Sequence, residues 1–187
     1  MEQRANSKKS LESERLLLRP LTLADAEAVY LHWASDPAVT KYLRWEPNQS
    51  VADSETWLGQ VEQLYAEGRD YCYGMERKSD GRLVGSIGAF YHEESGRYEV
   101  GYCLERALWG QGYMTEALAR LVRFLTEEEH ILRFSCSHSP ENPASGRVMQ
   151  KCGFVFQNKT EPCYNAAGEF LFDSLLYHLD TEPTATK

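Results

Sequence analysis

Leu108-Trp-Gly-Gln-Gly-Tyr-Met-Thr-Glu116 decides the fold of this chain, because it joins a strand to the helix with the clearest periodicity. The preceding segment, residues 97–104, alternates in the way typical of a strand. After the glycines, apolar residues recur at helical spacing and predict an amphipathic helix: Met114, Ala117, Leu118, Leu121, Val122 and Leu125. A second strand is expected at residues 132–137. Residues 97–137 are therefore predicted to form a βαβ unit whose two strands are parallel.

The loop between that strand and helix contains two glycines, Gly110 and Gly112. Glycine lets a ligand approach the backbone closely, and the first N–H groups of a helix have no partner within it. The loop therefore predicts an anion site, with a cofactor pyrophosphate as the favoured ligand, although a simple tight turn explains two glycines equally well. No Gly-Lys-Ser/Thr follows, and Thr115 occupies the third glycine position of a dinucleotide fingerprint.

The pattern on either side of this unit predicts the rest of a mixed α/β domain. Helices are expected from Thr22 and from Ser50, each of which begins a capping-box pattern that ends in aspartate. Further strands are expected at residues 14–19, 71–77, 83–91, 154–157 and 170–179, with a short helix at 144–151 and a long loop at 158–168. The fold expected is a central twisted sheet of about seven strands, mostly antiparallel and flanked by helices.

Length and composition limit what the protein can be. The chain has 187 residues, 42% of them hydrophobic, and a formal net charge of −8. One domain is expected at residues 13–180, between a flexible arm at 1–12 and a flexible tail at 181–187. The negative charge argues against a nucleic-acid partner, and no apolar stretch reaches the ~20 residues of a membrane span. Five cysteines without a C-x-x-C pair indicate a reducing, cytoplasmic setting and no metal site.

Four short stretches, the glycine loop among them, occur in one order along the chain: Glu99-Val-Gly-Tyr102, Trp109-Gly-Gln-Gly-Tyr-Met-Thr-Glu-Ala117, Glu141-Asn-Pro-Ala-Ser145 and Lys151-Cys-Gly-Phe154. Together they resemble the GNAT superfamily of acetyl-CoA-dependent N-acetyltransferases. The opening Arg15-Leu-Leu-Leu-Arg-Pro20 and the closing Asp173 and Tyr177 are similar to its ribosomal-protein N-terminal branch, the RimJ/RimL type. The resemblance covers about residues 13–180 and implies a single-domain GNAT-like fold with a splayed parallel strand pair at the cofactor cleft.

The same resemblance implies acetyl-CoA as cosubstrate and assigns residues to it. Backbone groups of Tyr102, Cys103 and Leu104 would bind the pantetheine arm, and Asn142 and Ser145 would lie beside the thioester. The pyrophosphate would be bound by the loop residues Trp109, Gly110, Gln111, Gly112, Tyr113, Met114 and Thr115.

Three positions depart from the family pattern. Trp109 replaces the usual Arg or Gln, and Met114 replaces Gly or Ala; because the contacts are mainly backbone, cofactor binding is expected to survive both. Met149 replaces a tyrosine general acid found in many relatives, and a thioether cannot donate a proton.

Two side chains are candidates for the chemistry. Glu99 is the candidate base, directly or through water, because it shares a strand face with Gly101 and Cys103 and the family uses a glutamate here. A solvated carboxylate opposite a cation is the alternative. Ser145 is the candidate general acid or the group that holds the departing sulfur. Helix capping is an equal alternative for Ser145, with Asn142 favoured as the cap. Cys103 is expected to be an inert, half-buried thiol.

Four residues are predicted to contact the substrate. Tyr42, Arg44 and Trp45 follow the first helix, where the family borders its acceptor entrance, although core packing explains the aromatic residues equally well. Asp173 would shape the acceptor site, but a buried structural hydrogen bond is the favoured interpretation for it and for Tyr177.

The expected function is direct acetyl transfer, within a ternary complex, to a primary amine, with a protein N-terminus as the first choice. The alternatives are a small-molecule acceptor, such as an aminoglycoside or polyamine, and a catalytically weak acyl-CoA-binding sensor. Fold resemblance does not separate them. Both a monomer and a homodimer are compatible with the sequence.

Overall fold

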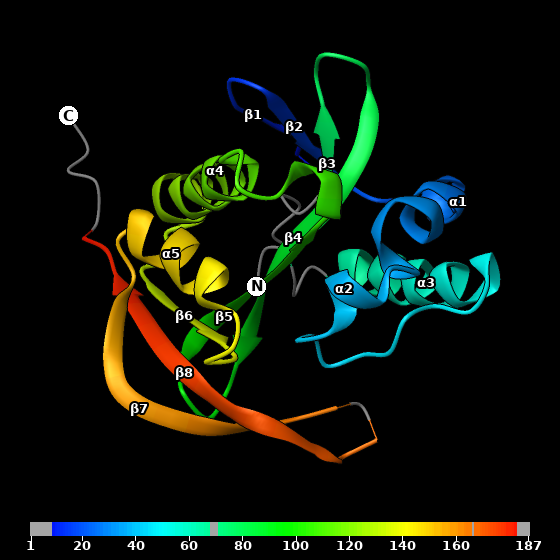
Figure 1. Ribbon diagram of the computed structural model, residues 1–187. Helices are drawn as coiled ribbons and strands as arrows, with labels where there is room; N and C mark the ends of the chain where they lie inside the picture. Colours follow the sequence, from blue (N-terminus) through cyan, green and yellow to red (C-terminus); the bar gives the residue numbers. More distant parts are fainter. Residues whose placement is uncertain (1–8, 68–70, 166, 183–187) are drawn as a thin grey trace.

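A single eight-stranded sheet forms the centre of the molecule in the computed structural model, which describes residues 9–67, 71–165 and 167–182 (Figure 1). Its strand order is β1-β2-β3-β4-β5-β6-β8-β7. The strands are β1 (Leu11–Glu12), β2 (Leu16–Arg19), β3 (Tyr71–Arg77), β4 (Arg82–His92), β5 (Arg97–Leu104), β6 (Arg133–His138), β7 (Val155–Tyr164) and β8 (Phe170–Asp180). Only β5 and β6 are parallel among these pairs, as the βαβ pattern predicts.

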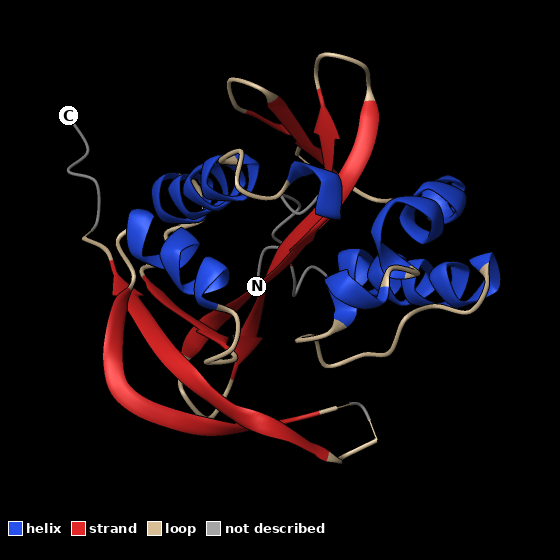
Figure 2. Cartoon of the chain, in the orientation of Figure 1, coloured by secondary structure: helices blue, strands red, loops and turns tan. Residues whose placement is uncertain are grey.

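Helices cover both faces of the sheet (Figure 2). They are α1 (Ala26–Val29), α2 (Pro37–Thr40), α3 (Val51–Glu67), α4 (Tyr113–Glu127) and α5 (Pro143–Lys151). Short 3-10 turns at Leu23–Asp25 and Arg106–Leu108, and a π-helical turn at Tyr30–Ala34, complete the helical segments. Asp25 and Asp53 accept hydrogen bonds from the backbone N–H groups of Thr22 (2.8 Å) and Ser50 (2.9 Å), so both predicted helix starts are confirmed.

The two helical layers have separate cores. The apolar stripe of α4 packs with α5 against one face of the sheet, and all six of its predicted apolar positions are buried. On the other face, α1 and α3 surround Trp33 and Leu58, which are also fully buried. Because β4 and β5 lie between the layers (Figure 1), residues that alternate along β5 face one core or the other.

The sequence did not predict two short elements, β1 and α2. Residues 11 and 12 were assigned to a flexible arm, but Leu11 is 1% exposed and pairs with Leu18. A two-residue strand is too short to show alternation in sequence, and it brings the strand number to eight. The four-residue helix α2 was not predicted, because it is shorter than two turns of periodicity.

The loop expected at residues 158–168 is mostly strand, since β7 runs on to Tyr164. Its polar run is typical of a loop, but β7 is an edge strand, which tolerates polar residues and Pro162. The register shifts between Phe156 and Thr160, and Asn158 there has a φ of 52°. This irregularity breaks the alternation that would have revealed the strand.

Candidate functional site

The parallel strands β5 and β6 separate soon after they pair. In the β5–β6 ladder, Tyr98 pairs with Phe134 and Glu99 pairs with Ser135. By contrast, the whole length of β5 pairs with β4 on its other side. The second half of β5 therefore has a hydrogen-bonded neighbour on one side only. The βαβ pattern predicted that these strands are parallel, and the family resemblance implied that they are splayed.

Alternation along β5 decides which backbone groups face the split. The Glu105 N–H donates to the Val84 carbonyl (2.8 Å), so Glu105 and Val84 form a hydrogen-bonded pair of the antiparallel ladder. Tyr102 and Leu104 then occupy non-hydrogen-bonded positions and turn their backbone groups away from β4. Cys103 alternates with them and turns its backbone groups toward β4. This arrangement favours Tyr102 and Leu104 over Cys103 as backbone partners of a ligand.

The glycine loop presents its N–H groups beside this split. Gly110 and Gly112 have φ values of 75° and 82°, a left-handed conformation that favours glycine. Within the described part of the chain, no protein acceptor bonds the backbone N–H of any of residues 110–115. A Cβ added at Gly110 would meet no atom within 4 Å, so the loop is open to a ligand there. An open row of unpartnered N–H groups at the start of a helix fits a pyrophosphate.

The two unusual side chains of the loop leave this row open. Met114 is buried in the core beneath α4, so its bulk lies in the protein interior. Trp109 donates from Nε1 to the Leu104 carbonyl (2.8 Å) and thereby joins the loop to the end of β5. Of the two outward-facing residues of β5, Tyr102 thus keeps its carbonyl available, while the Leu104 carbonyl already has a donor.

Glu99 is paired with Arg44, which brings a predicted catalytic residue and a predicted substrate residue together. Arg44 Nη2 donates to Glu99 Oε1 (2.8 Å), and the Glu99 side chain is 29% exposed. Burial disfavours the charge on Arg44, but Glu99 and Cys163 outweigh it and raise the Arg44 pKa. The candidate base is therefore engaged by a cation, and in the described residues no donor bonds its second oxygen, Oε2.

Ser145 and Tyr102 form a hydroxyl pair across the split, between α5 and β5. Asn142 accepts a hydrogen bond from the Ser145 N–H (3.3 Å), which confirms Asn142 as the helix cap. The Ser145 hydroxyl oxygen lies 2.9 Å from that of Tyr102, and Tyr102 also donates to the Ser145 carbonyl (3.2 Å). Burial raises the Tyr102 pKa well above its usual value, so this hydroxyl stays protonated.

Gly146 lets α5 approach β6 closely. A Cβ at this position would lie 2.5 Å from His138 Nε2, and the buried His138 ring is fixed by the Ser139 carbonyl, 2.7 Å from Nδ1. We therefore expect Gly146→Ala to lower the free energy of unfolding by about 1–3 kcal/mol in urea titrations. Gly59→Ala in α3 is the matched control. Its Cβ would meet nothing within 4 Å, and it should be neutral or stabilising. Equal stability of the two variants would contradict this packing.

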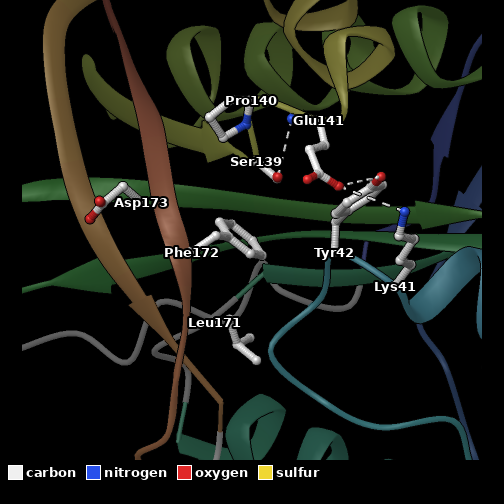
Figure 3. A pocket seen from close by; sticks show the side chains of 8 residues that line it. All are labelled: Lys41, Tyr42, Ser139, Pro140, Glu141, Leu171, Phe172 and Asp173. Atoms are coloured by element: carbon white, nitrogen blue, oxygen red, sulfur yellow. Dashed lines mark hydrogen bonds and ion pairs between the residues drawn. The ribbon is translucent and has the colours of Figure 1, made fainter.

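A pocket of about 420 Å³ opens beside the loop between β6 and α5 (Figure 3). Its lining residues are Lys41, Tyr42, Ser139, Pro140, Glu141, Leu171, Phe172 and Asp173. Glu141 Oε2 accepts from the Tyr42 hydroxyl (3.4 Å) and lies 3.7 Å from Lys41 Nζ. The Tyr42 ring meets Phe172 edge-on at 6.5 Å between centroids.

The pocket contains two of the four predicted substrate residues, Tyr42 and Asp173. Asp173 is exposed, and no partner of its carboxylate occurs in the described chain, so the favoured interpretation of it as a buried structural hydrogen bond was wrong. That interpretation fits Tyr177, which is buried with its hydroxyl 3.4 Å from His138 Nε2. Trp45 is 37% exposed and does not line the pocket.

Cys103 is not suited to nucleophilic catalysis. Its sulfur lies 3.2 Å from the Ser86 hydroxyl, and burial raises the pKa of its thiol, so it is a poor nucleophile.

Among residues 9–67, 71–165 and 167–182, no three His, Cys, Asp or Glu side chains gather as metal ligands would. No helix in these same ranges is long and apolar enough to cross a membrane.

The sequence profile of the family described as acetyltransferase (GNAT) domain matches residues 15–155. The chain belongs to the GNAT family. This GNAT chain is 29% identical over 171 residues to the uncharacterised N-acetyltransferase p20 of Bacillus licheniformis, covering 91% of the chain and 95% of p20. It is 25% identical over 152 residues to the [ribosomal protein uS5]-alanine N-acetyltransferase of Escherichia coli, covering 77% of each.

A solved structure has the same fold as this chain over nearly the whole length of the chain. RimL, a ribosomal L7/L12 α-N-protein acetyltransferase solved with coenzyme A, superposes with a TM-score of 0.82 at 19% identity, covering 94% of this chain and 100% of RimL. The GNAT domain and the N-acetyltransferase relatives identify the chain as an acetyl-CoA-dependent acyltransferase. They leave its acceptor open.

Two parts of the site could not be predicted from the sequence. Tyr102 was expected to contribute backbone contacts only, and no role was expected for Arg15, whose guanidinium contacts the glycine loop. The partners of both lie far along the chain, 43 residues away for Tyr102 and 96 for Arg15, so no local pattern signals them.

Proposed function

We propose that this GNAT enzyme transfers acetyl from acetyl-CoA to the N-terminal α-amine of a protein, by direct attack in a ternary complex. The observation that supports it most is the open row of N–H groups at residues 110–115, next to the split between β5 and β6. When bound, acetyl-CoA supplies the activated thioester. Residues 109–115 would hold its pyrophosphate, and the backbone of Tyr102 and Leu104 would hold its pantetheine arm.

Glu99 removes the first of the two protons that the ammonium group of the substrate loses as it becomes an amide. An ammonium group can take the place of the Arg44 guanidinium, because both are cations that donate to the same carboxylate. Glu99, directly or through a water, then accepts a proton and leaves the amine nitrogen free to attack the thioester carbon. The new C–N bond forms as the C–S bond breaks, and the sulfur departs with the electron pair of that bond. The nitrogen then gives up its second proton, which passes to the sulfur, so the products are the amide and the thiol of coenzyme A.

Ser145 donates a hydrogen bond to that departing sulfur. Each hydroxyl of the Ser145–Tyr102 pair has one hydrogen, and the Ser145 carbonyl can only accept. In the resting arrangement Tyr102 therefore donates to the carbonyl and Ser145 donates to Tyr102. When the Ser145 hydroxyl turns to the sulfur, Tyr102 can donate to Ser145 Oγ instead, so the serine keeps a partner. This pair would take the role of the tyrosine general acid that Met149 replaces, because the Met149 thioether has no proton to donate.

Two considerations favour an α-amine over a lysine side chain. An α-amine has an ordinary pKa near 8 against about 10.4 for lysine, so it requires less assistance from a base that already holds a cation. The pocket beside α5 contains the unpaired Asp173 carboxylate and the Tyr42 and Phe172 rings, which suit the start of a peptide chain. The names of RimL and the uS5 enzyme state protein acceptors for those relatives. A ribosomal acceptor would place the enzyme in the cytoplasm.

Thiol release from acetyl-CoA tests the acceptor class. Lysine-free peptides with a free N-terminus should be acetylated, whereas the same peptides with a blocked N-terminus and one added lysine should react at least about tenfold more slowly, because the lysine amine is mostly protonated. A polyamine and an aminoglycoside complete the panel. Faster turnover of either small amine would replace the protein acceptor with a small-molecule one. Tight acetyl-CoA binding without turnover of any amine would support the acyl-CoA sensor.

A further inference from the structure

The side chain of Arg15, in the bend just before the strand β2, contacts the glycine loop. Arg15 Nη1 donates to the Gln111 carbonyl (3.0 Å), and its guanidinium carbon lies 4.2 Å from the centroid of the Tyr113 ring. A Cβ added at Gly112 would lie 3.5 Å from Arg15 Nη2. The guanidinium therefore contacts Gln111, just before α4, and Tyr113, the first residue of α4, and lies beside Gly112 between them.

The Arg15 side chain is itself held in place by Glu116, in the first turn of α4. Arg15 Nε donates to Glu116 Oε2 (2.7 Å), and the Arg15 backbone N–H donates to Glu116 Oε1 (2.7 Å). The Ser13 hydroxyl donates to the same Oε1 (2.7 Å). These bonds raise the Arg15 pKa and, against the effect of burial, lower that of Glu116, so both groups are charged.

The contacts of Arg15 matter because the glycine loop is intrinsically flexible. Two of its residues are glycines with positive φ, and glycine loses more conformational freedom on ordering than any other residue. N–H groups that must converge on an anion bind it best when they are already ordered. Arg15 bonds the carbonyl of the residue between the two glycines and leaves the N–H groups free.

We propose that Arg15 is a positioning residue, which fixes the loop of residues 110–113 so that its N–H groups converge on the pyrophosphate of coenzyme A. The role depends on the fork shape of the guanidinium, which bonds Glu116 and Gln111 at once; the single ammonium of lysine cannot reproduce that geometry. This inference rests on the acetyl-CoA site of the proposed function, but binding measurements test it without any turnover.

The test compares coenzyme A with pantetheine, which lacks the pyrophosphate. Calorimetry should show coenzyme A binding Arg15→Gln and Arg15→Lys about tenfold more weakly than wild type. Pantetheine binding, followed by ligand-observed NMR, should be unchanged. Arg19→Gln is the matched control, since Arg19 lies in β2 and pairs with two carboxylates, those of Asp25 and Glu76, which belong neither to the loop nor to α4. It should lose comparable thermal stability and keep wild-type affinity for both ligands.

Three results would overturn the proposal. Wild-type affinity in Arg15→Lys would mean that charge alone is needed. Equal weakening in Arg15→Gln and Arg19→Gln would mean general destabilisation, and equal weakening for pantetheine and coenzyme A would mean that the pyrophosphate is not involved. A wild-type protein that fails to bind coenzyme A would overturn the proposed function as well, whereas normal binding without acetyl transfer would leave the role of Arg15 intact.

Discussion

Glu99→Gln is expected to lower kcat with a peptide acceptor by at least about a hundredfold, the usual lower bound for loss of a general base. Glutamine keeps the size and a hydrogen-bond acceptor but cannot take the proton that the amine loses. Binding of acetyl-CoA should be unaffected, because the glycine loop and the outward-facing backbone of β5 are unchanged. The measurement is steady-state thiol release at saturating acetyl-CoA, with calorimetry for binding.

Arg44→Gln distinguishes a catalytic role of Glu99 from a structural one. It removes the same ion pair as Glu99→Gln but keeps the Glu99 carboxylate. Exposed pairs of this kind contribute up to about 1 kcal/mol, so both variants should unfold at similar temperatures. We expect Arg44→Gln to change KM for the amine and to alter kcat by less than about fivefold. If the two variants lost kcat equally, Glu99 would act only as the partner of Arg44, and the base would have to be another group.

Gly112→Val is expected to weaken acetyl-CoA binding by at least about tenfold. Gly112 has a φ of 82°, where a side chain with a Cβ costs roughly 1–2 kcal/mol and a branched one more. The loop can relieve that strain only by rotating the N–H groups that face the ligand. Its added side chain would also press on the Arg15 guanidinium, 3.5 Å from the Cβ position. Calorimetric titration with acetyl-CoA measures the loss.

Gly81→Val provides the same backbone strain away from the site. Gly81 has a φ of 69°, lies in the turn between β3 and β4, and has no atom within 4 Å of an added Cβ. It should lose a similar amount of stability and bind acetyl-CoA as wild type does. Wild-type affinity in Gly112→Val would show that the ligand does not depend on the conformation of this loop.

Long, regular patterns predicted the fold well, and irregular ones did not. The stripe from Met114 to Leu125 located α4 and its buried face, and the βαβ unit it completes located the parallel pair β5–β6. β7 was shortened because its polar edge run and its register shift hide the alternation, and β1 was missed because two residues carry no period. Local sequence patterns predict local structure, whereas an edge strand forms because it pairs with a neighbouring strand, which a local pattern does not identify.

The candidate site divides in the same way. The glycine loop and the Asn142 cap could be predicted because their geometry is set by adjacent residues. The engagement of Glu99 by Arg44 and the Tyr102–Ser145 pair join segments that meet only in the folded chain. A residue type at one position cannot reveal such a contact, so the sequence could nominate Glu99 and Ser145 but not their partners.

Calorimetric titration of the wild-type protein with acetyl-CoA shows directly whether the glycine loop and the split between β5 and β6 form an acetyl-CoA site. ATP and NADPH serve as controls, because each offers phosphates without the pantetheine arm. We expect saturable binding of one acetyl-CoA per chain and no saturation with either control. At a hundred times its Kd, acetyl-CoA should also stabilise the fold by about 2.7 kcal/mol. Absence of acetyl-CoA binding, or equal affinity for ATP, would contradict the assignment of this site.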